Sequence, residues 1–228
     1  ISPGGLTDWS EDALIERARA VAEITPVFGF YLQPAVGGRE LSYDFWRRFF
    51  DIDGVHGVKI ACFDRYRTFD VMRAASESRR RGEIALYTGN DDNIVGDLLT
   101  TFPGNGGMGF VGGLLGQWAV WTHRAVELLE RVKEARAQES VPSDLLTEGA
   151  ELTDANGAIF DAHNAFRGSI AGVHEVLRRQ GLLAGTWCLD PREVLSPGQR
   201  EAIERVCSAY PHLTDDDFVR ERLDEWLS

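Results

Sequence analysis

One lysine stands alone inside an apolar segment of the chain. Lys59 lies within residues 54–63 (GVHGVKIACF), a run that predicts a buried strand. An unpartnered ammonium is costly to bury, so such a lysine commonly becomes a neutral amine, which can form a Schiff base with a carbonyl. Gly57 and Ala61 should share its face of the strand and leave space for a ligand. The alternative is a structural lysine that pairs with a carboxylate or extends out of the sheet.

A tyrosine lies 28 residues before this lysine, in another apolar run. Tyr31 belongs to residues 26–33 (PVFGFYLQ), and Pro34 ends the run. A phenol beside a Schiff-base lysine can carry protons during carbinolamine formation and carbon–carbon cleavage. The same residue is also explained as a core tyrosine whose hydroxyl is hydrogen-bonded. Both interpretations remain open from these residues alone.

Polar side chains gather where the apolar runs end. They are Gln33, Asp64, Arg65, Thr88, Asn90, Asp91 and Asp92. In the segment 87–92 (YTGNDD), Gly89 permits a sharp turn, and an amide beside two carboxylates can hold sugar hydroxyls or exchange protons. Aspartates in this position can equally cap the next helix. Two adjacent aspartates do not make a metal site, and no other ligand cluster accompanies them, so no metal is predicted.

These residues need a scaffold, and the apolar pattern predicts one of alternating strands and helices. Strands are predicted at Val27–Gln33, Val55–Phe63, Glu83–Gly89 and Gly107–Leu115. Helices are predicted at Glu11–Ile24, Ser42–Phe50, Arg67–Arg81 and Asp91–Phe102, and from about Gln117 past Glu134. Near-continuous apolar strands between helices indicate a parallel sheet. In a barrel or an open doubly wound sheet, the strand-to-helix loops then share one side, which carries the active site.

The glycine-rich segment 104–113 and the last part of the chain have a different character. The glycine-rich segment lacks both the P-loop ending and a GxGxxG pattern, so we interpret it as a loop that leads into a strand. No strand is predicted after Leu115. Helices are predicted at Ala158–Gln180, Gly198–Ala209 and Asp215–Leu227, with a loop at residues 140–143. We therefore predict a strand–helix region at residues 1–136 and a helical extension at residues 137–228.

Composition narrows the range of partners. The net charge of −12 argues against binding to nucleic acid, and we interpret the one tight basic run, Arg79–Arg81, as a solvated helix end. No segment has the length and polarity of a membrane span, and no signal peptide is recognised, so no membrane partner is expected. Cys62, Cys188 and Cys207 form no CxxC pair, which suits a reducing, cytoplasmic location.

Together these segments resemble the dihydrodipicolinate synthase / N-acetylneuraminate lyase family of class I aldolases. The motifs that match are Tyr31–Pro34 (Tyr-x-x-Pro), Gly57–Lys59 (Gly-x-Lys), Gly89–Asp92 (Gly-x-Asp and an acid) and Gly109–Gly112 (Gly-x-x-Gly). Their order and spacing agree over nearly the whole chain, most closely with a little-characterised branch. The resemblance implies an α/β fold, a TIM (β/α)8 barrel of which this chain carries strands five to eight, followed by a helical extension. Ile1–Pro3 resembles the end of strand four, and the first half of the barrel is expected upstream or in another chain.

The resemblance implies a Schiff-base lyase or aldolase that acts on a keto acid or ketose. Lys59 would be the nucleophile and Tyr31 the proton relay, and no cofactor is implied because the iminium takes up the electrons. The implied substrate-binding residues are Gln33, Arg65, Thr88, Gly89, Asn90, Asp91, Asp92 and Gly112. The arginine that often follows the proline in the family falls at Val36, which leaves Arg65 as a candidate anion binder. A dimer or tetramer is also implied.

Two other functions fit the same residues. One is a non-catalytic barrel that binds a carbonyl compound or a sugar and keeps Lys59 as a charge partner. The other is a metal-free sugar isomerase or epimerase that uses Asp91 as its base. Replacement of Lys59 and of Asp91 distinguishes these functions from a lyase.

Overall fold

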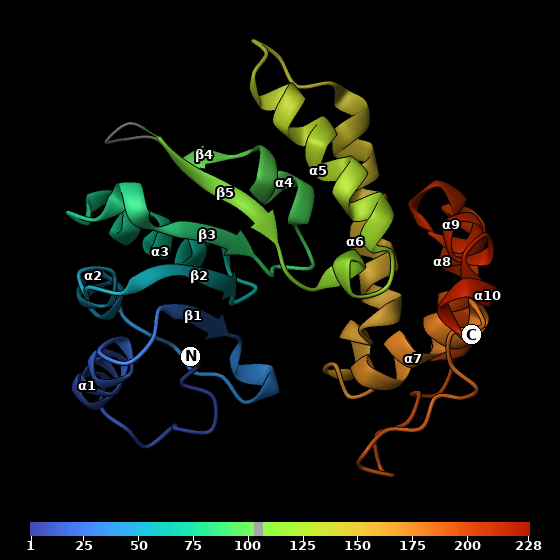
Figure 1. Cartoon of the computed structure of the whole chain (residues 1–228), viewed down its shortest axis with the longest axis horizontal. Coiled ribbons are helices and arrows are strands. Elements are labelled where there is room, and N and C mark those ends of the chain that lie inside the picture. Colours follow the sequence, from blue (N-terminus) through green and yellow to red (C-terminus); the bar gives the residue numbers. More distant parts are fainter. Residues whose placement is uncertain (103–106) are drawn as a thin grey trace. The chain divides into compact units, whose positions relative to one another are not determined.

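The computed structural model describes residues 1–102 and 107–228 (Figure 1). The chain divides into two compact units. The first comprises Ile1–Asn90 and Gly96–Leu114, and the second comprises Asp91–Val95 and Leu115–Ser228. The boundary predicted at residue 136 differs from this division because it follows the strand–helix repeat, whereas helix α5 (Thr122–Arg136) packs with the short helix η3 (Gly116–Ala119) in the second unit. No helix among the described residues is both long and apolar enough to cross a membrane.

The first unit is built on a sheet whose parallel strands follow one another in chain order. They are β1 (Val27–Leu32), β2 (Val55–Ala61), β3 (Ala85–Thr88) and β5 (Met108–Gly113). Each strand pairs in parallel with the one before it, as predicted. A doubly wound sheet reverses its strand order at one point, whereas a (β/α) barrel adds every strand at the same edge. The observed order is therefore that of an arc of a barrel.

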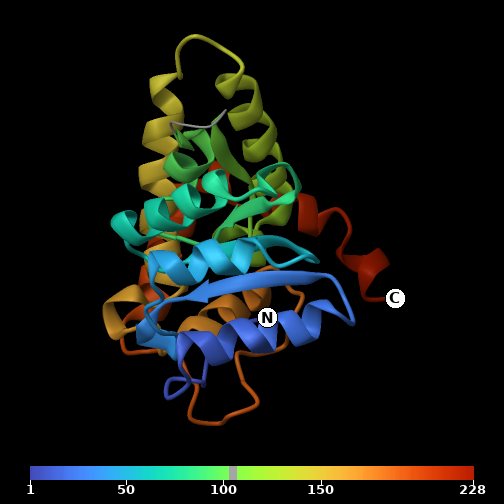
Figure 2. The same cartoon turned by 90° about the vertical axis from the view of Figure 1, so that its left-hand side faces the viewer.

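Three helices cover one face of this sheet. They are α1 (Glu11–Ala22), α2 (Tyr43–Phe50) and α3 (Arg65–Glu77), which lie side by side along it (Figure 2). Each begins at a polar cap, since Ser10, Ser42 and Asp64 accept hydrogen bonds from Ala13, Phe45 and Arg67 amides. The aromatic residues of α2 are all buried: Phe45, Trp46, Phe49 and Phe50. These contacts form the core between the helices and the sheet.

Residues 91–102 depart from the helix predicted there. Helix α4 spans only Ile94–Leu99, and β4 (Thr101–Phe102) then pairs antiparallel with β5. A strand of two residues is too short to show the alternation of polar and apolar residues that predicts a strand, so β4 could not be predicted. Of the glycine-rich segment 104–113, residues 104–106 lie outside the described part, and the residues from Met108 onward form β5 as predicted.

The basic run Arg79–Arg81 is not the end of a helix. Helix α3 ends at Glu77, and the short helix η2 (Arg81–Glu83) follows after a break. Arg80 is only 8% exposed; its guanidinium donates to the carbonyl of Ile52 and lies 2.9 Å from a carboxylate oxygen of Glu83. Carbonyl and carboxylate partners compensate the burial of this charge, so Arg80 is a structural residue.

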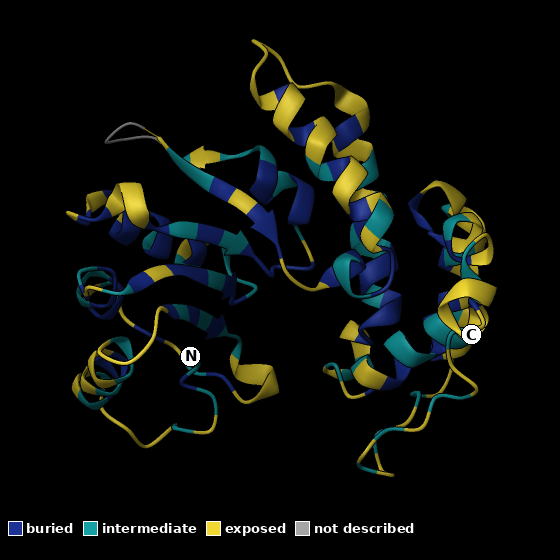
Figure 3. Ribbon diagram, in the orientation of Figure 1, coloured by how far each residue is buried: buried dark blue, intermediate teal, exposed yellow. Residues whose placement is uncertain are grey.

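After Leu115, the described residues of the second unit form helices and loops and no strand, as predicted. Besides η3 and α5 it contains α6 (Ser143–Ile159), η4 (Ala162–Asn164), α7 (Ser169–Arg179), α8 (Gln199–Ala209), η5 (Pro211–Leu213), α9 (Asp216–Arg220) and α10 (Leu223–Trp226). The buried positions of α5 recur three or four residues apart, at Ala125, Leu128, Val132 and Ala135, and its other side is exposed (Figure 3).

Two of the predicted helices are interrupted in this unit. The helix predicted at Ala158–Gln180 is broken between Ile159 and Ser169, where Asp161, Ala165 and Phe166 adopt left-handed backbone conformations. The Asp161 carboxylate favours this break because it accepts hydrogen bonds from the Gly168 amide at 2.9 Å and from the Ser196 hydroxyl at 2.6 Å. The terminal helix predicted at Asp215–Leu227 is likewise two short helices, α9 and α10.

Candidate functional site

Lys59 and Tyr31 lie on opposite faces of the sheet. In the parallel register, Lys59 of β2 is the partner of Phe30 in β1 and of Tyr87 in β3, whereas Tyr31 is the partner of Ile60. Successive side chains of a strand point to opposite faces. Lys59, Phe30 and Tyr87 therefore share one face, and Tyr31 points to the face that the helices cover.

Aromatic rings and a glycine surround Lys59 on its face. Its Nζ lies 4.5 Å from the centre of the Phe30 ring, a distance at which a cation is attracted to the ring face. The rings of Phe28 and Tyr87 meet edge to face, with their centroids 5.4 Å apart. A Cβ atom built on Gly89 would lie only 2.4 Å from the Lys59 Cε. The lysine side chain therefore occupies the space that Gly89 leaves.

Small residues on the neighbouring strands keep this face open, as the sequence predicted for Gly57 and Ala61. A Cβ atom on Gly89 would meet the Ala61 Cβ at 3.0 Å, and one on Gly57 would meet the Phe28 ring at 2.6 Å. Gly112, predicted to bind substrate, is the register partner of Tyr87, and a Cβ atom there would lie 3.0 Å from that ring. These glycines provide room for the rings and for the lysine.

A methyl group at Gly89 tests the placement of Lys59. In Gly89→Ala the new Cβ would overlap the Lys59 Cε and would also press on the Ala61 Cβ at 3.0 Å and the Leu114 carbonyl at 3.2 Å. We therefore expect the lysine to move and the fold to lose about 1–2 kcal/mol of unfolding free energy. The rate at which Lys59 reacts with a carbonyl compound under borohydride should fall severalfold, as measured by intact mass. An unchanged rate would show that Lys59 does not lie against Gly89.

Tyr31 has the environment of a core residue. Its side chain is 1% exposed, its ring centroid lies 5.0 Å from that of Trp46, and its hydroxyl accepts hydrogen bonds from the Leu41 amide and from Arg67. Burial raises the pKa of Tyr31 above its ordinary value. The expected juxtaposition of Tyr31 with Lys59 is therefore wrong. The spacing of 28 residues placed both on neighbouring strands, but the register places them on different faces.

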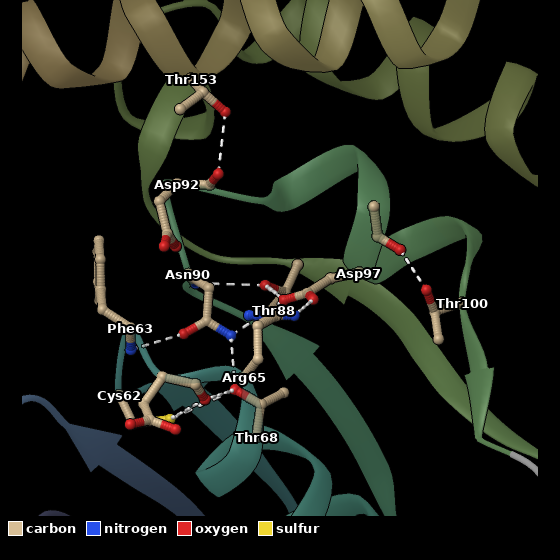
Figure 4. Close-up of polar contacts among 12 residues, drawn as sticks. Cys62, Phe63, Arg65, Thr68, Thr88, Asn90, Asp92, Asp97, Thr100 and Thr153 are labelled. Atoms are coloured by element: carbon tan, nitrogen blue, oxygen red, sulfur yellow. Dashed lines mark hydrogen bonds and ion pairs between the residues drawn. The ribbon is translucent and has the colours of Figure 1, made fainter. Parts of the chain in front are cut away.

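Three of the predicted substrate-binding residues instead contact one buried aspartate, Asp97 of α4 (Figure 4). Its Oδ2 accepts hydrogen bonds from the Thr88 hydroxyl at 2.6 Å and from the Asn90 amide at 3.0 Å. Its Oδ1 pairs with the guanidinium of Arg65. Asp97 is 1% exposed, and Thr88 and Asn90 are fully buried. These side chains therefore hold the loops after β2 and β3 together, and nothing in their geometry assigns them to a ligand.

The same cluster fixes the backbone where β2 ends. Asn90 donates to the Thr68 hydroxyl at 3.2 Å and accepts from the Phe63 amide at 3.0 Å (Figure 4). Phe63 has a φ of 54°, the left-handed conformation that is rare outside glycine. Such strained residues persist where their surroundings over-determine them. The loop that follows the strand of Lys59 is thus held in a defined conformation.

The remaining predicted residues lie at the ends of strands or in the second unit. Gln33 follows β1, and its main-chain carbonyl accepts a hydrogen bond from the Gly38 amide at 3.0 Å. Asp91 and Asp92 belong to the second unit, where side chains of α6 bind their main-chain carbonyls. Asn156 donates to Asp91 at 3.1 Å, and Thr153 donates to Asp92 at 3.0 Å.

Two residues at this site were not among those predicted from the sequence. Asp97 is a lone acid within the apolar run 94–99 (IVGDLL), the same kind of signal that singles out Lys59 in its strand. Tyr87 was treated as part of a polar segment, although its strand alternates buried and half-buried positions. No group of three or more His, Cys, Asp or Glu residues in the described ranges is arranged to hold a metal ion.

Comparison with known proteins supports the fold. No protein-family model and no curated protein matches the sequence. Solved structures do match. They include dihydrodipicolinate synthase from Acinetobacter baumannii complexed with pyruvate (20% identity, TM-score 0.67, 88% of this chain and 61% of that chain). The enzyme of the same name from Bacteroides thetaiotaomicron matches at 16% identity with a TM-score of 0.66 (88% and 62%). A variant of 2-keto-3-deoxygluconate aldolase from Sulfolobus solfataricus matches at 17% identity with a TM-score of 0.62 (90% and 61%).

These matches have two consequences. The chain spans about 60% of the length of the structures that it matches. Identities of 16–20% carry information on the fold and not on the reaction. The structural neighbours are class I aldolases of TIM-barrel fold, and this chain has an α/β fold that matches part of that barrel.

Proposed function

We propose that this chain carries the Schiff-base half of a lyase or aldolase that acts on a keto acid or a ketose. The observation on which the proposal depends is the position of Lys59, on the ring-lined face of a barrel-like arc of parallel strands. The likeness of the fold to class I aldolases supports it. A lysine in the middle of such a sheet face is suited to nucleophilic attack on a carbonyl carbon.

In the proposed reaction, the neutral Lys59 amine attacks the carbonyl carbon and forms a carbinolamine. Loss of water gives an iminium. A base then takes the proton of the substrate hydroxyl on the β-carbon, the bond between the α- and β-carbons breaks, the β-carbon fragment leaves as an aldehyde, and the iminium accepts the electron pair to become an enamine. Protonation of the resulting enamine and hydrolysis return the amine and the carbonyl product. The iminium is itself the electron sink, so the proposal includes no cofactor. Asp91, Asp92 and Gln33 remain candidates for substrate hydroxyls.

We further propose that the four parallel strands are strands five to eight of a (β/α)8 barrel. The order of the motifs supports this assignment, because Tyr-x-x-Pro, Gly-x-Lys and Gly-x-Asp fall at successive strands. A dimer or tetramer remains part of the proposal. The sheet face around Lys59 would then be completed by four further strand–helix units.

The proton relay is better assigned to Tyr87 than to Tyr31. Tyr87 shares the face of Lys59 and is its direct register partner, whereas the Tyr31 hydroxyl is engaged beneath the helices. We expect Tyr87→Phe to lower kcat about a hundredfold, the usual scale for the loss of a general acid or base. Tyr31→Phe should leave kcat nearly unchanged and cost about 1 kcal/mol of unfolding free energy through the lost hydrogen bonds. If steady-state kinetics showed a large loss of kcat in Tyr31→Phe and none in Tyr87→Phe, the proton relay would be Tyr31.

Borohydride trapping tests the proposed function directly. The protein, shown to be folded by circular dichroism, is reduced with pyruvate and then with a panel of 2-keto acids and ketoses, and its intact mass is measured. The chain has only two lysines, Lys59 and Lys133, so peptide mapping assigns any adduct to one of them or to the terminal amine. An adduct on Lys59 establishes the Schiff base and identifies the substrate class.

The same experiment separates the alternatives. No adduct with any carbonyl compound, on folded protein that includes all eight strands, would exclude the lyase and favour the non-catalytic binding barrel. The engagement of Arg65, Thr88 and Asn90 by Asp97 leaves fewer side chains to bind a ligand in either case. Turnover that survives Lys59→Ala but not Asp91→Asn would identify the isomerase.

A further inference from the structure

The second unit contains a cavity that the proposed lyase does not use. Its volume is about 230 Å³, and it lies among η3, α5, α6 and η5. Four aliphatic residues line it: Ala125, Leu128, Leu152 and Leu213, each at most 4% exposed. Arg124, Glu127, Arg131, Glu148 and His212 also line it. The cavity thus combines a buried aliphatic surface with polar side chains, and both kinds of group are used by sites for small molecules.

One polar side chain of this cavity is almost completely buried. Gln117 of η3 lines the cavity and is 2% exposed, and neither its Nε2 nor its Oε1 has a partner among the described residues. Its main-chain carbonyl is fixed by hydrogen bonds from the Val120 and Trp121 amides, so the residue is held in place. A buried amide without partners costs free energy, which makes this side chain unusual.

A second buried glutamine has a side-chain amide whose hydrogen bonds are all made within the protein. Gln199 of α8 is 4% exposed, and its Nε2 donates to the carbonyls of Ile159 and Gly168, both at 3.1 Å. Its Oε1 accepts from the Ser196 amide at 3.0 Å. Both ends of this amide are satisfied by protein groups. The equally buried Gln117 therefore has a donor and an acceptor to offer to another molecule.

The charges around the cavity are already paired with one another. Arg124 lies 2.7 Å from Glu127, Arg131 lies 2.8 Å from Glu148, and His212 lies 2.9 Å from Glu151. An ionic ligand would have to displace one of these pairs, whereas an uncharged ligand would not. The groups that remain available to bind a ligand are therefore the amide of Gln117 and the aliphatic surface of the cavity.

We propose that this cavity binds a small uncharged molecule with an apolar body and an amide-type edge. In such an edge a hydrogen-bond donor lies beside an acceptor, as in a lactam, a carboxamide or a nucleobase. The edge matches both atoms of the Gln117 amide at once, because a primary amide also presents a donor beside an acceptor. Glutamine recognises adenine in this bidentate manner.

Paired probes test this proposal on the whole chain. Binding of 2-piperidone, nicotinamide and uracil is measured by ligand-observed NMR titration, with N-methyl-2-piperidone as the control that lacks the donor. We expect 2-piperidone to bind at least about tenfold more tightly than its N-methyl derivative, since the derivative leaves a buried acceptor unpaired. Equal binding of the two lactams would overturn the proposal, and so would the absence of binding by all of the amide-edged probes.

Two glutamine variants complete the test. Gln117→Met keeps the side-chain volume and removes the amide, so it should abolish the preference for 2-piperidone without lowering the melting temperature. Gln138→Met makes the same change at an exposed position after α5 and should bind the probes as the unaltered protein does. Unaltered binding by Gln117→Met would contradict the proposal. So would a lower melting temperature, because the amide would then have a structural partner such as a trapped water.

Discussion

Lys59→Met is expected to lower turnover at least about a thousandfold and to abolish the borohydride adduct. Methionine has nearly the length of lysine but no amine, so the variant keeps the bulk beside Phe30 and Gly89 and removes the nucleophile. Removal of a catalytic nucleophile typically costs more than this, with the residual rate coming from substrate binding and positioning. The measurements are kcat and intact mass after reduction, both with the carbonyl compound that the unaltered protein accepts.

The other lysine of the chain is the matched control. Lys133 of α5 is half exposed and pairs with Glu130 at 2.6 Å on the helix surface. Lys133→Met should keep both the adduct and the turnover, and exposed pairs of this kind contribute at most about 1 kcal/mol to stability. If Lys59→Met retained the adduct and Lys133→Met lost it, the Schiff base would belong to α5. A Lys59→Met protein that turned over substrate normally would contradict the lyase altogether.

The strand of Lys59 was predictable because its signal is local. An apolar run with one lysine and two small residues defines a strand, its buried character and the residues that share a face, and Gly57 and Ala61 lie where they were predicted. The alternation of strands and helices likewise indicates a parallel sheet. Each of these inferences needs only the residues within one segment and the period of a strand.

The relation between strands was not predictable in the same way. Whether Tyr31 faces Lys59 depends on the register of β1 against β2, and a shift of one residue exchanges the faces of a strand. The spacing in sequence between the two residues contains no information on that register. Both the residues and the family resemblance suggested that Tyr31 lies beside Lys59, and the observed pairing of Lys59 with Phe30 and Tyr87 corrects that placement.

The polar residues at the ends of the strands illustrate a second limit. Thr88, Asn90 and Arg65 were predicted to face a substrate because polar groups collect at the loops that follow parallel strands. Their partner is Asp97, which lies on the next helix and was hidden inside an apolar run. Composition shows that a loop is polar, but only the fold shows whether its polar side chains bind one another or remain available to a ligand.

Asp97→Ala is therefore expected to cost about 2–4 kcal/mol of unfolding free energy in the first unit, the scale for leaving two buried hydrogen-bond donors without their acceptor. The carboxylate is 1% exposed and accepts hydrogen bonds from Thr88 and Asn90 in addition to the guanidinium of Arg65. Without it, the fully buried Thr88 and Asn90 lose a shared acceptor, whereas the partly exposed Arg65 can be hydrated. Urea unfolding followed by circular dichroism measures the change.

An exposed aspartate that also pairs with an arginine is the matched control for Asp97. Asp70 of α3 pairs with Arg73 at 2.8 Å with its side chain about half exposed, so Asp70→Ala should change stability by less than about 1 kcal/mol. If both variants unfolded at the same urea concentration, the Asp97 cluster would not hold the fold, and its polar groups would again be available to a ligand. If Asp97→Ala is destabilised as expected and Lys59 still forms its adduct at low temperature, the cluster maintains the loops after β2 and β3 and is not needed for the reaction of Lys59. Such a result would fit the register, which turns Lys59 and Thr88 to opposite sides of the sheet.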